Sequence, residues 1–229
     1  PFQARVEQTL TAPLRFERKL ETGRFAPKMI RDVATAPGGR SVVFHALGQL
    51  WTRTLPNGKP QRMTTHQGVY EYQPSFDAAG DKLLYTTWSD AELVTLRERD
   101  LASGKEHVLN TTRGFYYGPR YSPDGTRIVY ARTGGSGLTG SPWSAERGIY
   151  VMPAAGGAAR RIAKEGEAPQ FSADGRRVFY FTGGGLSKKL HSVGIDGEEP
   201  REVFSLKYPD LVSISPDGRW VAFTELFNA

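Results

Sequence analysis

A short turn motif recurs along this chain of 229 residues. The best copies read Tyr-Ser-Pro-Asp-Gly, Phe-Ser-Ala-Asp-Gly and Ile-Ser-Pro-Asp-Gly, and they end at Gly125, Gly175 and Gly218. Degraded copies place Gly39 and Gly80 in the same role. Successive turn glycines are 41, 45, 50 and 43 residues apart, which is the period of a four-stranded propeller blade. The repeat therefore constrains the fold much more tightly than it constrains the function.

Each unit has the local chemistry of an antiparallel sheet. In the turn, Pro presets φ, Asp hydrogen-bonds its own backbone, and Gly accepts a positive φ. An alternating run of β-branched and aromatic residues follows, and a second turn leads to a short polar strand that suits the outer edge of a blade. The expected strands are 30–35, 40–46, 49–54 and 60–63; 73–77, 82–88, 92–99 and 105–109; 118–122, 127–132, 148–152 and 158–163; and 168–172, 176–181, 189–194 and 200–204. The pattern predicts an all-β propeller of four-stranded antiparallel blades, with almost no helix.

Evenly spaced repeats predict one domain over residues 1–229, with four full blades at about 30–204 and partial blades at 1–24 and 210–229. The chain begins at Pro1 without methionine, and its last unit ends after a second strand. We therefore expect a fragment of a longer chain and an incomplete ring. The alternative is that the strand expected near residues 4–10 completes the last blade. The incomplete ring is favoured, because the third strand of the last blade has no evident source.

Composition excludes several classes of protein. The chain has no cysteine, so neither a disulfide framework nor a thiol nucleophile is available. No apolar stretch is long enough to span a membrane. The net charge is +6, but the 30 Lys and Arg residues are scattered without a basic run, which favours a solvated surface over a nucleic-acid partner.

The Ser-Pro-Asp-Gly-Arg repeat resembles the TolB-type propeller repeat over nearly the whole chain. A narrower resemblance is to the propeller region of bacterial amidohydrolase-family proteins. The segments that carry the narrower resemblance are Val6–Thr11, Ile30–Asp32, Leu50–Trp51, Leu55–Gly58, Glu71–Pro74, Thr87–Asp90, Ser141–Tyr150 and Glu225–Ala229. In that family the metal ligands lie in a separate hydrolase barrel. The resemblance thus implies a hydrolase parent whose divalent metal, zinc by analogy, lies outside this segment, and no cofactor within the segment.

No catalytic motif stands out among the residues. The four histidines, His45, His66, His107 and His191, lie in different repeats without metal-ligand spacing. Ser136 lies in a glycine-rich insertion that misses the nucleophile-elbow pattern at its last position. The recurring Asp124, Asp174 and Asp217 are interpreted as structural turn residues. We predict no catalytic and no metal-binding residue in this segment.

The connections suggest where a partner binds. In an antiparallel blade, the connections between second and third strands share one end with those that lead to the next blade. These connections carry the expansions and many aromatic residues, whereas the turns at the other end are tight, so we expect binding at the aromatic end. The candidate residues are Tyr70, Tyr72, Trp88, Asp90, Tyr116, Tyr117, Arg132, Trp143, Arg147 and Tyr208. The competing interpretation is that some of these aromatics cap blade cores.

These observations favour a propeller module that is non-catalytic by itself. The resemblance implies that it docks on, or gates, the hydrolase domain of a larger metal-dependent amidohydrolase. One alternative is a stand-alone TolB-type scaffold that binds protein partners, and another is the propeller of a prolyl-peptidase-like serine hydrolase. A periplasmic or secreted location is expected from the resemblance alone, since no signal peptide is visible.

Overall fold

A computed structural model describes residues 27–134, 146–184, 187–207, 209–215 and 217–225 of the chain. All regular elements in these ranges are strands. Blade one comprises β1 (Arg31–Thr35), β2 (Ser41–Ala46), β3 (Gln49–Thr54) and β4 (Gln61–Arg62). Blade two comprises β5 (Tyr70–Phe76), β6 (Lys82–Ser89), β7 (Leu93–Asp100) and β8 (Glu106–Val108). Blade three comprises β9 (Phe115–Tyr121), β10 (Arg127–Thr133), β11 (Gly148–Pro153) and β12 (Arg160–Ala163). Blade four comprises β13 (Glu167–Phe171), β14 (Arg177–Gly184), β15 (Ser187–Gly194) and β16 (Arg201–Lys207), and β17 (Pro209–Ile214) pairs with β18 (Val221–Glu225).

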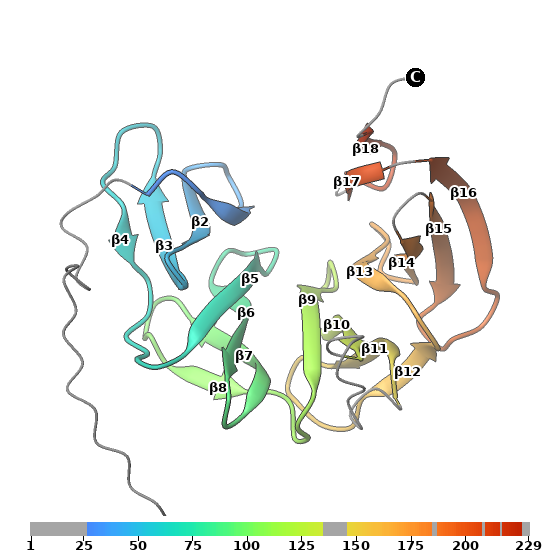
Figure 1. The fold of residues 1–229 in the computed structure, drawn as a ribbon, viewed down its shortest axis with the longest axis horizontal. Coiled ribbons are helices and arrows are strands. Elements are labelled where there is room, and N and C mark those ends of the chain that lie inside the picture. The colour runs from blue at the N-terminus through green and yellow to red at the C-terminus, as the bar shows by residue number, and fades with distance from the viewer. Residues whose placement is uncertain (1–26, 135–145, 185–186, 208, 216, 226–229) are drawn as a thin grey trace, which may run out of the picture.

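The sheets fan around a common centre in an open arc (Figure 1). Every full blade is an antiparallel meander, with its first strand innermost and its fourth strand at the outer rim. The inner strands contact one another in order, β1 with β5, β5 with β9, and β9 with β13. The predicted all-β propeller of four-stranded antiparallel blades is confirmed.

The apolar core lies between neighbouring blades. Leu50 of blade one packs with Leu83 and Tyr85 of blade two. In the same way, blades two and three share one buried cluster, and blades three and four share another. A single blade is too thin to bury both of its faces, so each blade depends on its neighbour.

The recurring turns are stabilised as their sequence predicts. In blade three, Asp124 Oδ1 accepts hydrogen bonds from Ser122 Oγ at 2.5 Å and from the Thr126 backbone N–H at 3.0 Å. The Ser122 hydroxyl, followed by Thr126, lowers the pKa of Asp124 to about 2. Gly125 has a φ of +69°, which explains the glycine. The same contacts form at Asp174 and Asp217, so the structural role predicted for these aspartates is confirmed.

The inner strands contain a feature that the sequence pattern did not predict. The pairing register shifts in each inner strand of the full blades, beside a residue with positive φ. These residues are Asp32 (φ 49°), Gln73 (φ 55°), Gly118 (φ 60°) and Ala168 (φ 48°). The strand then resumes its pairing on the far side of this bulge. For this reason β5 begins at Tyr70 and β9 begins at Phe115, each three residues earlier than the expected 73 and 118.

The bulges also connect neighbouring blades. The Gln73 backbone N–H donates to Asp32 Oδ2 at 3.2 Å, and the Gly118 N–H donates to Gln73 Oε1 at 2.8 Å. In blades one and two, the side chain at the bulge therefore accepts a hydrogen bond from the bulge of the next blade.

Candidate interaction face

The end of the arc that carries the β2–β3, β6–β7 and β10–β11 connections is the candidate interaction face. The β6–β7 and β8–β9 connections are shorter than the sequence suggested, because the aromatic residues assigned to loops extend the strands instead. Tyr70 and Tyr72 belong to β5, Trp88 belongs to β6, and Tyr116 and Tyr117 belong to β9. The β2–β3 connection is only Leu47 and Gly48. Strand ends, more than loops, thus present the aromatic side chains.

Four rings at this face form an aromatic cluster, consisting of His45, Tyr70, Tyr72 and Trp88. The Tyr70 ring centroid lies 5.7 Å from that of Trp88 and 6.5 Å from that of Tyr72. Tyr72 in turn lies 4.8 Å from His45, which belongs to blade one. Tyr70 remains 49% exposed, whereas Tyr72 and Trp88 are half-buried. The cluster crosses the boundary between blades one and two and offers its outermost ring to solvent.

Local backbone geometry explains why the cluster forms here. Tyr70 and Trp88 are directly paired residues on β5 and β6, so their side chains share one face of the sheet. A Cβ atom at Gly48 would lie 2.6 Å from Tyr70 Cδ1, and Gly48 has a φ of +78°. Only glycine allows the tight β2–β3 turn and the close approach of the Tyr70 ring.

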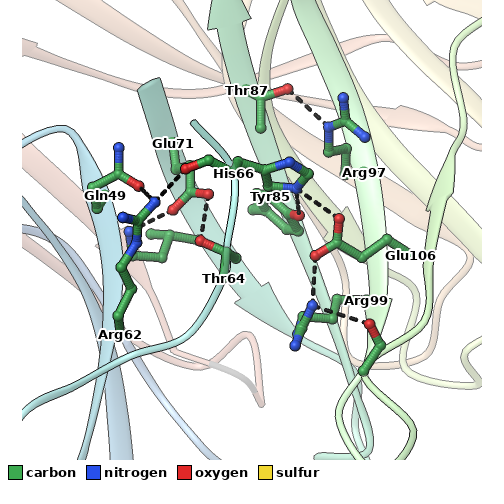
Figure 2. Close-up of polar contacts among 12 residues, drawn as sticks. Gln49, Arg62, Thr64, His66, Glu71, Tyr85, Thr87, Arg97, Arg99 and Glu106 are labelled. Atoms are coloured by element: carbon green, nitrogen blue, oxygen red, sulfur yellow. Dashed lines mark hydrogen bonds and ion pairs between the residues drawn. The ribbon is translucent and has the colours of Figure 1, made fainter. Parts of the chain in front are cut away.

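Glu71 fixes the strand that carries both tyrosines (Figure 2). Its side chain is fully buried on the opposite face of β5 from Tyr70 and Tyr72, because side chains alternate along a strand. One carboxylate oxygen accepts the Leu50 backbone N–H at 2.7 Å, and the other accepts the Thr64 hydroxyl at 2.5 Å. Glu71 is therefore a positioning residue, and the sequence analysis missed it.

A second polar group holds the connection between β4 and β5 against blade two (Figure 2). His66 Nε2 lies 2.7 Å from Glu106 Oε2 and 3.2 Å from the Tyr85 hydroxyl, while Arg99 Nη1 donates to Glu106 Oε1 at 2.6 Å. Burial raises the pKa of Glu106, but Arg99, Tyr85 and His66 together outweigh burial and leave it below its usual value. His66 therefore joins two blades.

His45 has an unusual environment within the cluster. Both of its ring nitrogens are buried, and neither has a hydrogen-bond partner among the described residues. Burial lowers the pKa of His45, and Arg31 adds to this effect, whereas Asp32 and Glu71 oppose it. The ring thus behaves as an apolar support for Tyr72.

The other candidate residues do not gather with the cluster. Tyr116 is only 5% exposed and packs in the core of blade three, with its hydroxyl donating to the Thr112 carbonyl at 2.7 Å. Its assignment to a binding surface is corrected to a core residue, as the competing interpretation foresaw. Tyr117, on the other side of the pleat, is 46% exposed and faces the centre of the arc. Asp90 is exposed in the β6–β7 connection, two residues after Trp88.

The two arginine candidates lie beside blade three. The Arg132 side chain is 13% exposed and forms an ion pair with Glu146. Its guanidinium carbon lies 5.8 Å from the Tyr116 ring centroid, so Arg132 covers the core. Arg147 is exposed just before β11. Trp143 and Tyr208 lie outside the described residues.

Neither a metal site nor a spanning helix is found in the part of the chain that the structure describes. No group of three or more His, Asp or Glu side chains there is arranged to hold a metal ion. None of the described elements is a helix long and apolar enough to cross a lipid bilayer.

Comparison with known proteins supports the fold. No protein-family model matches the chain. The Tol-Pal system protein TolB of Rickettsia bellii is 28% identical over 109 residues, which are 48% of this chain and 23% of that protein. TolB of Rickettsia rickettsii is 35% identical over 75 residues, 33% of this chain and 15% of that protein. The chain thus spans less than a quarter of the curated relatives it matches.

The solved structure of TolB from Acinetobacter baumannii superposes with a TM-score of 0.67 at 19% identity, covering 84% of this chain and 48% of that one. A structure assigned as TolB from Agrobacterium tumefaciens gives a TM-score of 0.69 at 20% identity, covering 87% of this chain and 76% of that one. The sequence repeat, the meander of each blade and these superpositions agree. The chain forms a TolB-like β-propeller.

Proposed function

We propose that this propeller is a non-catalytic module that binds a folded protein partner through the aromatic cluster. The observation that carries the proposal is the rigid presentation of Tyr70. Its ring is half exposed, yet it is held between the Gly48 backbone and Trp88, on a strand fixed by the buried Glu71. A pre-ordered aromatic side chain loses little conformational entropy on binding, which is why such residues dominate interface energies.

Two partners are compatible with this surface. The resemblance to amidohydrolase-family proteins favours the hydrolase domain of the same longer protein, on which the propeller docks or whose entrance it gates. That domain would hold the divalent metal, zinc by analogy. The likeness to proteins of the Tol-Pal system favours instead a separate protein, bound by a TolB-type scaffold. We take the hydrolase domain as the first candidate and the scaffold as the alternative.

A photo-crosslinker in place of Tyr70, in the natural full-length protein, separates the two partners. We expect a crosslinked peptide from the hydrolase region of the same polypeptide, whereas a peptide from another protein would support the scaffold. The matched control carries the crosslinker at Val203, which is 48% exposed on the outer strand β16. If position 70 crosslinks no more than position 203, this surface is not a docking face.

A change in affinity completes the test. The double substitution Tyr70→Ala and Trp88→Ala should weaken binding of the crosslinked partner at least tenfold, about 1.4 kcal/mol or more. Circular dichroism of the variant must show an intact propeller. Unchanged affinity in a folded variant would reject the aromatic cluster as the contact.

We further propose a periplasmic location, which the likeness to Tol-Pal system proteins supports. Fractionation of the source bacterium with an antibody against the propeller tests this proposal. Recovery of the full-length protein with cytoplasmic markers would contradict it.

A further inference from the structure

The inner strands present an axial surface, which is the side of β1, β5, β9 and β13 that faces the centre of the arc. Its bulge positions differ between the two halves of the arc. Asp32 and Gln73 each supply an oxygen that accepts a backbone N–H of the next blade. Gly118 and Ala168 stand at the same place in blades three and four and have no polar side chain. The bulges of blades three and four therefore place no polar side chain on the axial surface, unlike the bulges of blades one and two.

Arg120 projects onto this part of the axial surface. It follows the bulge of β9, and its side chain is solvent-exposed. Even so, the surrounding protein desolvates its guanidinium enough to lower its pKa, and the Asp32 carboxylate opposes that change. Asp32 belongs to blade one and Arg120 to blade three, with blade two between them. The bulge hydrogen bonds from Gln73 to Asp32 and from Gly118 to Gln73 connect the two positions across blade two, on the side that faces the centre of the arc.

Tyr117 is the neighbour of Arg120 on the other side of the bulge. It is 46% exposed. Partial burial raises its pKa, Asp32 of blade one and Glu167 of blade four add to the effect, and a hydrogen bond with the Gln73 side chain opposes it. Its hydroxyl therefore stays protonated and able to donate at neutral pH. Arg120 and Tyr117 place a cation and a hydroxyl donor on one exposed surface.

Arg120 forms no ion pair with a described side chain. Among the described residues its only hydrogen bond is to the preceding residue, in which Arg120 Nη1 donates to the Pro119 carbonyl at 3.2 Å. Glu167 pairs with Lys188 at 2.6 Å, and Asp32 accepts the Gln73 N–H. The remaining N–H groups of Arg120 are donors that an anion can engage, and the planar guanidinium can form two parallel hydrogen bonds to one carboxylate.

We propose that the axial surface binds a carboxylate group at Arg120, with the Tyr117 hydroxyl as second donor. A carboxylate matches the planar fork of a guanidinium and carries one negative charge. Asp32, across the centre of the arc, disfavours a second negative charge, so the site selects a monocarboxylate over a phosphate dianion. The carboxylate belongs either to a small molecule or to a peptide terminus. This site is separate from the aromatic cluster and does not depend on the proposed docking function.

The test is an NMR titration of the purified chain, following the side-chain Nε–Hε signal of Arg120, which is assigned by its loss in Arg120→Gln. The probes are acetate, a tripeptide with a free C-terminus, its C-terminal amide and inorganic phosphate. We expect saturable shifts with acetate and with the free tripeptide, and at least about tenfold weaker binding of phosphate, equivalent to ~1.4 kcal/mol. Tighter binding of the free tripeptide than of acetate identifies a peptide terminus, and equal binding identifies a small carboxylate.

Three variants check the assignment through the Tyr117 ring signals. Arg120→Gln should abolish the response, and Asp32→Asn should narrow the preference for acetate over phosphate. The matched control Arg201→Gln removes an exposed arginine from the outer strand β16 and should change nothing. If Arg120→Gln does not fold, Arg120→Lys takes its place and should weaken acetate binding, because lysine lacks the fork. Absence of a saturable shift, equal binding of the tripeptide amide, or an unchanged response in the Arg120 variant would overturn the proposal.

Discussion

Glu71 illustrates how one buried side chain organises a surface at the scale of the residue. Its two oxygens accept hydrogen bonds from Leu50 N–H and from the Thr64 hydroxyl, which belong to blade one and to the connection that follows it. A buried carboxylate is tolerated only with such partners. Because Tyr70 and Tyr72 flank it in the strand, the same contacts fix the direction in which both rings point. Orientation of the exposed ring is therefore decided on the opposite, buried face of the sheet.

His45 predicts a pH dependence of stability. Its pKa is lower in the folded chain than the usual 6.5, chiefly because of burial. The unfolded chain therefore binds a proton at a higher pH than the folded chain does. As pH falls below about 7, the free energy of unfolding should decline until the folded pKa is passed. In His45→Phe, which keeps an aromatic ring against Tyr72, urea denaturation between about pH 7 and pH 5 should show a shallower decline.

The control for this prediction is His107→Phe, since His107 lies exposed on the outer strand β8. It should leave the pH profile as steep as in the unmodified chain. Equal slopes in the His45→Phe variant and the unmodified chain would show that His45 does not resist protonation in the folded state.

Residue-scale features differ in how far the sequence predicts them. The turn aspartates are predictable, because Asp124 accepts its hydrogen bonds from Ser122 and Thr126, two residues away on either side. Glu71 is not, because its partners are 7 and 21 residues away and come together only when two blades pack. The prediction that Tyr116 lies on the binding surface was wrong for a related reason. A row of three aromatics does not reveal which one the pleat turns inward, and the β9 bulge shifts that alternation.

At the scale of the element, the bulged inner strand is the device that joins neighbouring blades. A left-handed backbone conformation costs free energy for any residue other than glycine. Gln73 and Ala168 both have this conformation. In Gln73 the bulge directs a side-chain oxygen to the Gly118 N–H. The strained backbone conformation at Gln73 thus positions its side chain to accept a hydrogen bond from the next blade.

Gln73→Ala should destabilise the chain by about 1–3 kcal/mol, because the buried Gly118 N–H loses its acceptor. The matched comparison is Ala168→Gly at the corresponding bulge, which relieves a strained φ and removes no hydrogen bond. It should cause no loss and a gain of at most about 1 kcal/mol. Urea denaturation measures both changes. A Gln73→Ala variant as stable as the unmodified chain would show that the link between β5 and β9 contributes nothing.

The strands themselves were largely predictable. In blade one the expected 49–54 matches β3, and the second strands of all four blades begin within one residue of expectation. Alternation and turn residues are local signals, and a repeated unit supplies them several times. The early starts of β5 and β9 were missed, because the bulges at Gln73 and Gly118 interrupt the local alternation of side chains. Only pairing with β6 and β10 carries each strand past its bulge.

At the scale of the whole molecule, stability is divided among the contacts between adjacent blades. Each of the first three blade boundaries has its own apolar cluster. The boundary between blades two and three adds a buried polar contact, in which the Tyr121 hydroxyl donates to Glu98 Oε2 at 2.5 Å, and Lys82 also pairs with Glu98 at 3.1 Å. Blades two and four have phenylalanine, Phe76 and Phe171, at the place of Tyr121.

Tyr121→Phe tests whether the blades are coupled only to their neighbours. Loss of the hydroxyl leaves the nearly buried Glu98 with one donor fewer, which should cost about 1–3 kcal/mol. In an array with nearest-neighbour coupling, that loss is confined to the two blades that share the contact. Amide hydrogen exchange should accelerate in β6, β7, β9 and β10, whereas β14 and β15 should keep their protection. The matched change is Tyr180→Phe, which removes the hydroxyl of a buried tyrosine in blade four. It should leave hydrogen exchange in β6 and β7 unaffected. Equal acceleration in every blade of the Tyr121 variant would mean instead that the arc unfolds as one cooperative unit.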